Sequence, residues 1–355
     1  MGIVRPGLLW VLSLLALASV AAPLQAQEST SPDAPPPAST APPPDVEDLP
    51  ATQRLKVGVN LVNVYFSARD KTGFAAGLTK NDCDVAEDHQ PQTIKEFTQE
   101  KNLPLTIGIL LDTSGSQEHV LPLEQDSGAR FLREVLTKKD EAFLISFDVN
   151  VDLLADFTDS PNELKRAIDK ASINAASSSA GIPGIGGGPM PTSNPRGTLL
   201  YDAVYLASHD KLQAQVGRKV LIILTDGQDQ GSQETSKSAI EAAQKANVIV
   251  YPILIADRAG YAAAGMIYTG SSQMEQLAHE TGGRVINVGN SGRKLEDAFD
   301  QIQDELRTQY LLSYTPTNKT ADGKYRHIEM ECGKGLKVQA RQGYYALTGE
   351  DNAND

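Results

Sequence analysis

Three short polar segments carry the oxygen-bearing side chains that could do chemistry. Asp112, Ser114 and Ser116 alternate with other residues in one segment, Thr198 precedes an apolar helical pattern, and Asp226 follows a second apolar run. Carboxylate and hydroxyl oxygens without histidine or thiolate suit Mg²⁺, Mn²⁺ or Ca²⁺, and poorly suit zinc, copper or iron. If the segments meet in the fold, these five residues could hold one hard divalent cation.

Two apolar runs must position the carboxylates. Residues 105–111 end abruptly at Asp112, and residues 220–224 end just before Thr225 and Asp226. Continuous apolar runs of this length are typical of strands buried on both faces. Ligands of open α/β sheets bind outside the carboxyl ends of such strands. The two acids therefore converge only if their strands are neighbours in one sheet.

The spacing of these residues resembles the metal-ion-dependent adhesion site of the von Willebrand factor type A (VWA) family. The resemblance implies that the hydroxyls of Ser114, Ser116 and Thr198 contact the metal, and that Asp112 and Asp226 act through water. It favours Mg²⁺, with Mn²⁺ or Ca²⁺ as alternatives. The ion then keeps a water-filled position that an Asp or Glu side chain of a protein partner can take.

Each polar segment also has an ordinary structural explanation. Ser114 or Ser116 could cap the next helix, and Asp226 could belong to a Thr-Asp-Gly turn. The occurrence of all three segments in the order that the family requires favours the metal site. A helix that starts after Ser116 would add attraction for an anion, of ~0.3 to 1 kcal/mol in exposed settings.

Strand and helix patterns alternate through the central part of the chain, which is assigned to a VWA domain at 101–308. The alternation predicts a doubly wound, mostly parallel α/β sheet. Strands are expected at 105–112, 141–147, 151–157 (an edge strand), 221–224, 248–255 and 284–288. Helices are expected at 120–136, after the Ser160-Pro161 pair, and at 239–246, 274–280 and 295–306.

Alternating apolar patterns before and after this domain predict further strands. They are expected at 57–65, 83–87, 93–97, 309–314, 325–331 and 335–341. Neither group has enough strands to stand alone. We therefore expect the segments 53–100 and 309–347 to form one small β-sandwich, with the central domain inserted between its halves.

The order of these segments is similar to that of the exported bacterial "VWFA-related" proteins of the Acidobacteria type. The similarity rests on residues 78–82, Glu87, Asp88, Gln92, Tyr310 and 341–345 and covers nearly the whole mature chain. It supports the expected fold and supplies little about the task of the protein.

The chain has two cysteines, one in each flanking group. In an oxidising compartment Cys83 and Cys332 could form a disulfide, which would stabilise the fold by ~4 to 5 kcal/mol in the chain-entropy model. The alternative for Cys83 is a small buried apolar residue, because it stands where the strand alternation expects one.

The ends of the chain predict export. Residues 1–26 combine Arg5, an apolar run and a Leu-Gln-Ala cleavage site, as in a secretory signal peptide. Residues 27–52 are Pro-rich and 348–355 polar, and both are expected to be disordered. No second run is long enough to span a membrane. The protein is thus expected in the periplasm, on the cell surface or outside the cell; uncleaved, the leader would act as an anchor.

Composition excludes some partners. Among 355 residues the apolar share is 40% and the charged share 22%, which is ordinary for a globular protein. The net charge of -13 argues against nucleic acid and against anionic membrane surfaces as partners. Composition leaves the oligomeric state open.

A glycine- and serine-rich stretch at 175–195 comes just before Thr198. Its glycines do not end in Gly-Lys-Ser/Thr and are not followed by a helix, so a phosphate-binding loop is not expected. Composition favours a disordered surface loop. The alternative is a mobile rim that covers the metal or grips a partner.

Enzyme functions find little support. A haloacid dehalogenase-type phosphatase needs a carboxylate where Ser114 stands, and no Gly-x-Ser-x-Gly elbow occurs. The five histidines lack paired zinc spacing, and His119, the one nearest the site, is expected to face solvent. We therefore expect a non-enzymatic, adhesion-type module; the alternatives are a hydrolase that uses the same cation and a structural envelope protein with a vestigial site.

Overall fold

The computed structural model describes residues 61–100, 103–173, 197–256 and 270–346. The expected leader at 1–26, the Pro-rich segment at 27–52, the loop at 175–195 and the tail at 348–355 lie outside these residues. All described residues belong to one unit, Gly58–Asp355. No helix within the described ranges combines the length and the apolar character needed to cross a bilayer.

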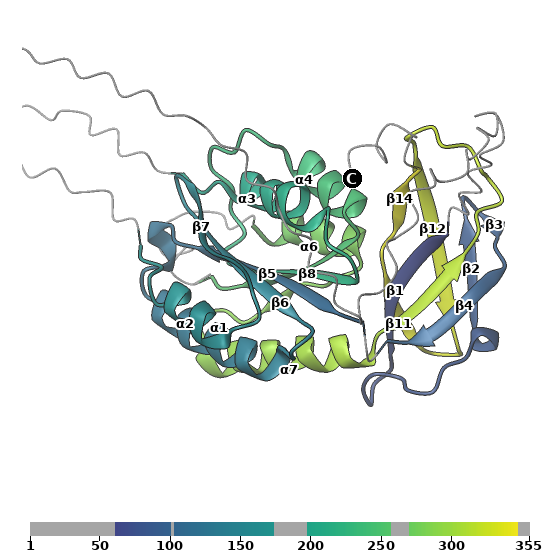
Figure 1. Ribbon diagram of the computed structural model, residues 1–355, viewed down its shortest axis with the longest axis horizontal. Helices are drawn as coiled ribbons and strands as arrows, with labels where there is room; N and C mark the ends of the chain where they lie inside the picture. Colours follow the sequence, from purple (N-terminus) through teal and green to yellow (C-terminus); the bar gives the residue numbers. More distant parts are fainter. Residues whose placement is uncertain (1–60, 101–102, 174–196, 257–269, 347–355) are drawn as a thin grey trace, which may run out of the picture. The chain divides into compact units, whose positions relative to one another are not determined.

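The centre of this unit is a six-stranded sheet with the order β10-β9-β8-β5-β6-β7 (Figure 1). Its strands are β5 (Leu105–Asp112), β6 (Glu141–Phe147), β7 (Val151–Thr158), β8 (Arg218–Thr225), β9 (Val248–Leu254) and β10 (Ile286–Asn287). All neighbouring strands are parallel except β6 and β7, which are antiparallel. The prediction of a mostly parallel α/β sheet is therefore confirmed.

β5 shows why an uninterrupted apolar run forms the middle strand. All eight of its residues are buried, because helices cover both faces of the sheet. Ile107 and Ile109 pack into the core on one face, and Leu110 packs into the core on the other. Gly108 leaves the space that the ring of Phe143 fills on the neighbouring strand. This packing makes β5 a rigid support for the residues at its end.

Two groups of helices cover the two faces (Figure 1). One face carries α1 (Leu121–Val135), α2 (Pro161–Ile168) and α7 (Gly292–Thr308). The other carries α3 (Leu200–Leu206), continued by a π-helical turn (Ala207–Leu212), with α4 (Ser236–Lys245) and α6 (Gly270–Thr281). Ser160 caps α2 as expected, since its side chain accepts a hydrogen bond from the Glu163 N–H.

The flanking strands form two four-stranded antiparallel sheets, with the orders β13-β1-β11-β4 and β14-β12-β2-β3. Their strands are β1 (Val62–Arg69), β2 (Cys83–Glu87), β3 (Gln90–Pro91), β4 (Ile94–Gln99), β11 (Tyr310–Tyr314), β12 (Tyr325–Cys332), β13 (Lys337–Ala340) and β14 (Gly343–Tyr345). Each sheet combines strands from before and after the central sheet, and one apolar core fills their interior. The fold class is as predicted, whereas the residue limits of the domains stay predictions.

Cys83 and Cys332 lie opposite each other in the β2–β12 pair and are joined by a disulfide. Both residues are buried. The bond joins a strand that precedes the central sheet to one that follows it, with a sequence separation of 249 residues. The covalent loop that it closes therefore contains all six strands of the central sheet.

Three details of the predicted strands were wrong. β1 runs to Arg69, beyond the expected end at residue 65; its Val62 and Val64 point into the flanking core, and Leu61 is exposed. Tyr65 packs instead against the core of the central domain, so both sides of β1 have apolar neighbours. The strand at 284–288 shrinks to two residues, and β14 was not predicted as a strand.

Candidate metal centre

The two predicted carboxylates lie at the ends of adjacent strands. β5 pairs in parallel with β8, and Leu111 is opposite Leu224. Asp112 is the last residue of β5, and Asp226 directly follows Thr225 at the end of β8. From β5 the chain builds the sheet first toward β6 and then, on the other side, toward β8. Such a reversal of strand order is where open α/β sheets bind ligands.

Asp112 is fully buried and is held by two hydrogen bonds. The backbone N–H of Ser114 donates to Oδ1 at 3.0 Å, and the Thr225 hydroxyl donates to Oδ2 at 2.6 Å. Thr225 Oγ1 also accepts from the Gly227 N–H at 3.0 Å. Sequence reasoning missed Thr225, which joins the two loops; its only signal is its place directly before a predicted acidic ligand.

Ser114 and Ser116 lie together, with their hydroxyl oxygens 3.0 Å apart. Ser114 stands at the N-cap position of a 3₁₀ turn (Gly115–Gln117), but its side chain makes no capping bond. α1 starts at Leu121, within one residue of the expected start at 120, with a proline in its first turn. Proline favours that position because its missing N–H is not needed there.

Thr198 is connected to the site through the backbone. It exchanges two hydrogen bonds of 2.9 Å with Gln230, in the loop that follows β8. The next residue, Leu199, donates its N–H to the Asp148 carbonyl at 2.8 Å, and the Thr113 hydroxyl donates to the Asp148 carboxylate at 2.8 Å. Asp148, which follows β6 and was not predicted, thus ties the Thr198 segment to the β5 loop.

Asp226 lies in the turn that the sequence offered as its alternative role. Its Oδ1 accepts a hydrogen bond from the Gln228 N–H at 3.0 Å. Gly227 has a φ of +82°, and a Cβ there would lie 2.8 Å from the Gly270 carbonyl oxygen, so only glycine fits. The turn does not remove Asp226 from the site, because its charge acts on Asp112 as described next.

Three buried acids act on one another here. Burial, followed by the charge of Asp226, raises the pKa of Asp112 to about 7, although hydrogen bonds from Ser114 and Thr225 lower it. Burial, followed by the charges of Asp112 and Asp226, raises the pKa of Glu124 well above its usual value. Negative charge gathered away from water favours a bound cation.

Glu124 was not among the predicted site residues. It lies in the first turn of α1 and is fully buried. The sequence holds one signal for it: Leu121, Phe131 and Val135 form an apolar stripe along α1, and Glu124 interrupts this stripe at a position that helical spacing reserves for the core.

The donor set of the five predicted residues fits a hard divalent cation. It offers only hydroxyl and carboxylate oxygens. Within the described ranges, no three His, Cys, Asp or Glu side chains gather closely enough to hold an ion by themselves. The hydroxyls would therefore be needed to complete a ligand shell. Hydrogen bonds bring Asp112, Ser114 and Ser116 together. Asp226 lies near enough for its charge to raise the pKa of Asp112, and backbone hydrogen bonds connect Thr198 to the loop after β8.

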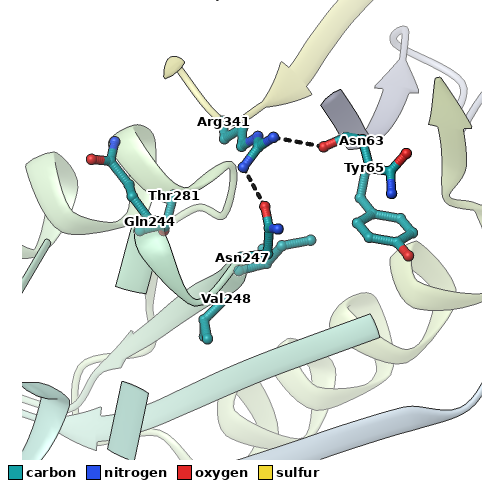
Figure 2. Close-up of a pocket in the computed structure, with 8 residues that line it drawn as sticks. Asn63, Tyr65, Gln244, Asn247, Val248, Thr281 and Arg341 are labelled. Carbon is teal, nitrogen blue, oxygen red and sulfur yellow. Dashed lines mark hydrogen bonds between the residues drawn. The ribbon is translucent and has the colours of Figure 1, made fainter. Parts of the chain in front are cut away.

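A small cavity elsewhere in the same unit is structural. Figure 2 shows Arg341 between Asn63 and Asn247, with its guanidinium directed at both. It donates to the Asn63 carbonyl at 2.7 Å and to the Asn247 side chain. The cavity beside them holds only about 10 Å³, the room of a single water. The cavity is too small for a ligand, and none of the residues that line it belongs to the candidate metal centre.

No protein-family model matches this chain, and no curated protein matches it either. Similar solved structures include BatB from Bacteroides thetaiotaomicron (18% identity, 57% of this chain and 98% of that chain, TM-score 0.41). They include the vWF domain of the pilus tip protein Mfa5 from Porphyromonas gingivalis (13%, 57% and 94%, TM-score 0.40). A third is proximal thread matrix protein 1 from the mussel byssus, with a zinc-occupied MIDAS motif (17%, 61% and 48%, TM-score 0.44).

Proposed function

We propose that this chain is an exported protein-interaction module that binds an acidic side chain of its partner through a divalent cation. Ser114, Ser116 and Thr198 hold the cation directly, and Asp112 and Asp226 hold it through water. When bound, the cation supplies a Lewis-acidic position for the partner's carboxylate. Mg²⁺ is the proposed ion, with Mn²⁺ or Ca²⁺ as alternatives.

The observation that carries the proposal is the buried pair of acids at the ends of β5 and β8. Asp112 and Asp226 are 0% and 3% exposed, and each raises the local negative potential. Two hydroxyls 3.0 Å apart lie in the same loop as Asp112. Neutral hydroxyl ligands leave a cation more of its charge than carboxylate ligands do, which favours an anionic group from outside.

We assign no catalytic residue. His119, the histidine nearest the site in the sequence, is exposed and lies in the turn before α1. A hydrolase would need a general base within hydrogen-bond reach of the activated water. Asp112 is already held by the Ser114 N–H and the Thr225 hydroxyl. These contacts support a binding function in preference to hydrolysis by the same cation.

The test is capture of partners from an envelope fraction by the immobilised mature chain, in Mg²⁺ or in EDTA. Asp112→Ala is run beside the wild type, and Asp84→Ala, which removes an exposed acid on β2, is the matched control. We expect capture by the wild type and by Asp84→Ala in Mg²⁺, and at least a tenfold loss with EDTA or with Asp112→Ala.

Calorimetric titration of the same proteins with Mg²⁺ and Mn²⁺ checks the site directly. Binding by the wild type and by Asp84→Ala, and none by Asp112→Ala, supports the proposal. Equal partner capture with and without chelator would show instead a structural protein with a vestigial site. Turnover of generic phosphoester or peptide substrates that Asp112→Ala abolishes would favour the hydrolase.

A further inference from the structure

Glu124 is a buried acid for which the described protein provides no hydrogen bond. Its side chain is 0% exposed, and neither Oε1 nor Oε2 has a partner among the described residues. A buried polar group without a partner lowers stability by ~1 to 3 kcal/mol, and a charged one by more. Leucine at this position would continue the apolar stripe of α1 without that loss. The acid is therefore kept at a cost to the fold.

The electrostatic surroundings of Glu124 are those of the candidate metal centre. The charges that act on it are those of Asp112 and Asp226, the two predicted acidic residues of the site. Both are like charges, so Glu124 adds to the repulsion within the site in the absence of a cation. A divalent ion would attract all three groups, and this attraction would outweigh their mutual repulsion.

Gln117 supplies a second, independent observation in the same segment. Its Nε2 donates to the Ser116 hydroxyl at 3.4 Å, and its own Oε1 is buried without a partner within the described part of the chain. Three buried acceptor oxygens, two on Glu124 and one on Gln117, thus have no hydrogen-bond donor among the described residues. Water is the donor that buried polar sites of this kind commonly hold.

An indirect role for Glu124 agrees with its contacts. Neither of its carboxylate oxygens makes a hydrogen bond to Ser114, Ser116 or Thr198, nor to any other described residue. A carboxylate that lies outside the ligand shell still acts on a cation by its charge and by orienting the ligands and waters that touch the ion. A role of this kind needs no contact between Glu124 and the ion.

We propose that Glu124 is a positioning residue of the cation site, whose buried carboxylate raises the affinity for the cation and accepts hydrogen bonds from water ordered there. Gln117 shares this water and keeps the Ser116 hydroxyl in place. This inference rests on the proposed function, because it needs a cation at Ser114, Ser116 and Thr198. It adds a third acid to the two that the spacing predicts.

The experiment is calorimetric titration of the purified chain with Mn²⁺ and with Mg²⁺. The variant is Glu124→Gln, which keeps the shape of the side chain and removes its charge. The matched control is Glu305→Gln, which makes the same change at another fully buried glutamate, on α7. If Glu305→Gln does not fold, Glu87→Gln replaces it, since Glu87 is buried in the flanking structure.

We expect affinity for both ions to fall about 10- to 100-fold in Glu124→Gln, the range found when a group that orients metal ligands is lost. The control should bind as the wild type does. Denaturant titration of the metal-free proteins adds a readout that a structural role would not reproduce, because Glu124→Gln should gain stability while it loses affinity.

Equal affinity of Glu124→Gln and the wild type overturns the inference and leaves the proposed function intact. An equal loss in Glu124→Gln and in the control also overturns it, since the effect would then come from general weakening of the fold. Absence of Mn²⁺ and Mg²⁺ binding by the wild type overturns the proposed function itself, and the two failures are thereby told apart.

Discussion

Two fully buried glutamates on helices of the central domain have opposite surroundings. Glu305 on α7 has a partner for each oxygen. Its Oε1 accepts from the hydroxyls of Ser67 at 3.1 Å and Tyr251 at 2.9 Å, and from the Gln339 amide at 2.6 Å. Its Oε2 accepts from the Arg284 guanidinium at 3.0 Å. These donors come from the central sheet domain and from β1 and β13, so Glu305 joins the two.

Glu124 on α1 has no hydrogen-bond donor among the described residues, and the charged side chains that act on it are the acids Asp112 and Asp226. The difference separates two reasons for burying a carboxylate. An acid whose donors are all provided by the chain serves the fold, whereas an acid left without them points to something that the chain does not itself contain. Position in the sequence alone does not distinguish the two residues.

The largest change in stability expected from this comparison is the loss caused by Glu305→Ala. The substitution leaves Arg284, whose side chain is 16% exposed, without its counter-charge and removes the acceptor of three other donors. Loss of one partner from a buried ion pair lowers stability by about 3 to 5 kcal/mol. Urea denaturation should show this as a lower midpoint. The control is Asp304→Ala, which removes an exposed acid on the same helix and should leave the midpoint unchanged.

A similar midpoint for Glu305→Ala and Asp304→Ala would break the comparison, because satisfied hydrogen bonds would then not be what holds Glu305. Cation affinity gives a further check. It should be unaffected by Asp304→Ala, and a change would show that α7 acts on the metal centre.

A smaller change in stability is expected when the pH of the metal-free protein is varied. The pKa of Asp112 is raised from 3.8 to about 7. Between these values the folded chain keeps a proton that the unfolded chain has lost, so stability is full below about pH 4 and falls as the pH rises toward 7. Saturating Mg²⁺ should remove this fall, since the ion stabilises the charged acid.

The measurement is the urea midpoint at several pH values with Mg²⁺ or with EDTA. Asp112→Asn, which cannot ionise, should show a shallower decline in EDTA than the wild type. If stability in EDTA instead rises between pH 4 and 7, Asp112 is not held in a region of excess negative charge, and the electrostatic argument for the cation fails.

The sequence predicted the central sheet well because its strands are defined by what they bury. The runs that became β5, β6 and β8 are mostly apolar between their ends, since helices cover both faces, and a short apolar run bounded by polar residues is typical of a buried strand. β1 shows the limit. The side that faces the flanking core carries Val62, Val64, Phe66 and Ala68, and the last two lie beyond residue 65, where the expected strand ended.

The candidate site divides in the same way. Asp112, Ser114 and Ser116 were visible because their spacing is local, and Asp226 because it ends a strand. Thr225 and Asp148 were not, since their roles depend on which strands are neighbours and on hydrogen bonds across loops. Glu124 could have been found only by asking why an acid interrupts an apolar stripe.

The smallest effect is expected from Glu124→Leu in the metal-free chain, and it has the opposite sign to that of Glu305→Ala. Leucine fills a similar volume, continues the apolar stripe of α1 and removes both unpaired oxygens together with the repulsion from Asp112 and Asp226. Replacement of a buried, poorly satisfied charge by an apolar side chain often raises stability by about 1 to 4 kcal/mol.

We expect the lower end of that range, because burial raises the pKa of Glu124 well above its usual value and so favours its uncharged form. Urea denaturation in EDTA measures the gain, and Glu305→Leu beside it should lose stability. If both leucine variants destabilise the chain, Glu124 has a partner that serves the fold, and the distinction between the two glutamates disappears. A gain for Glu124→Leu alone would show that the chain keeps this acid for a bound group and not for its own packing.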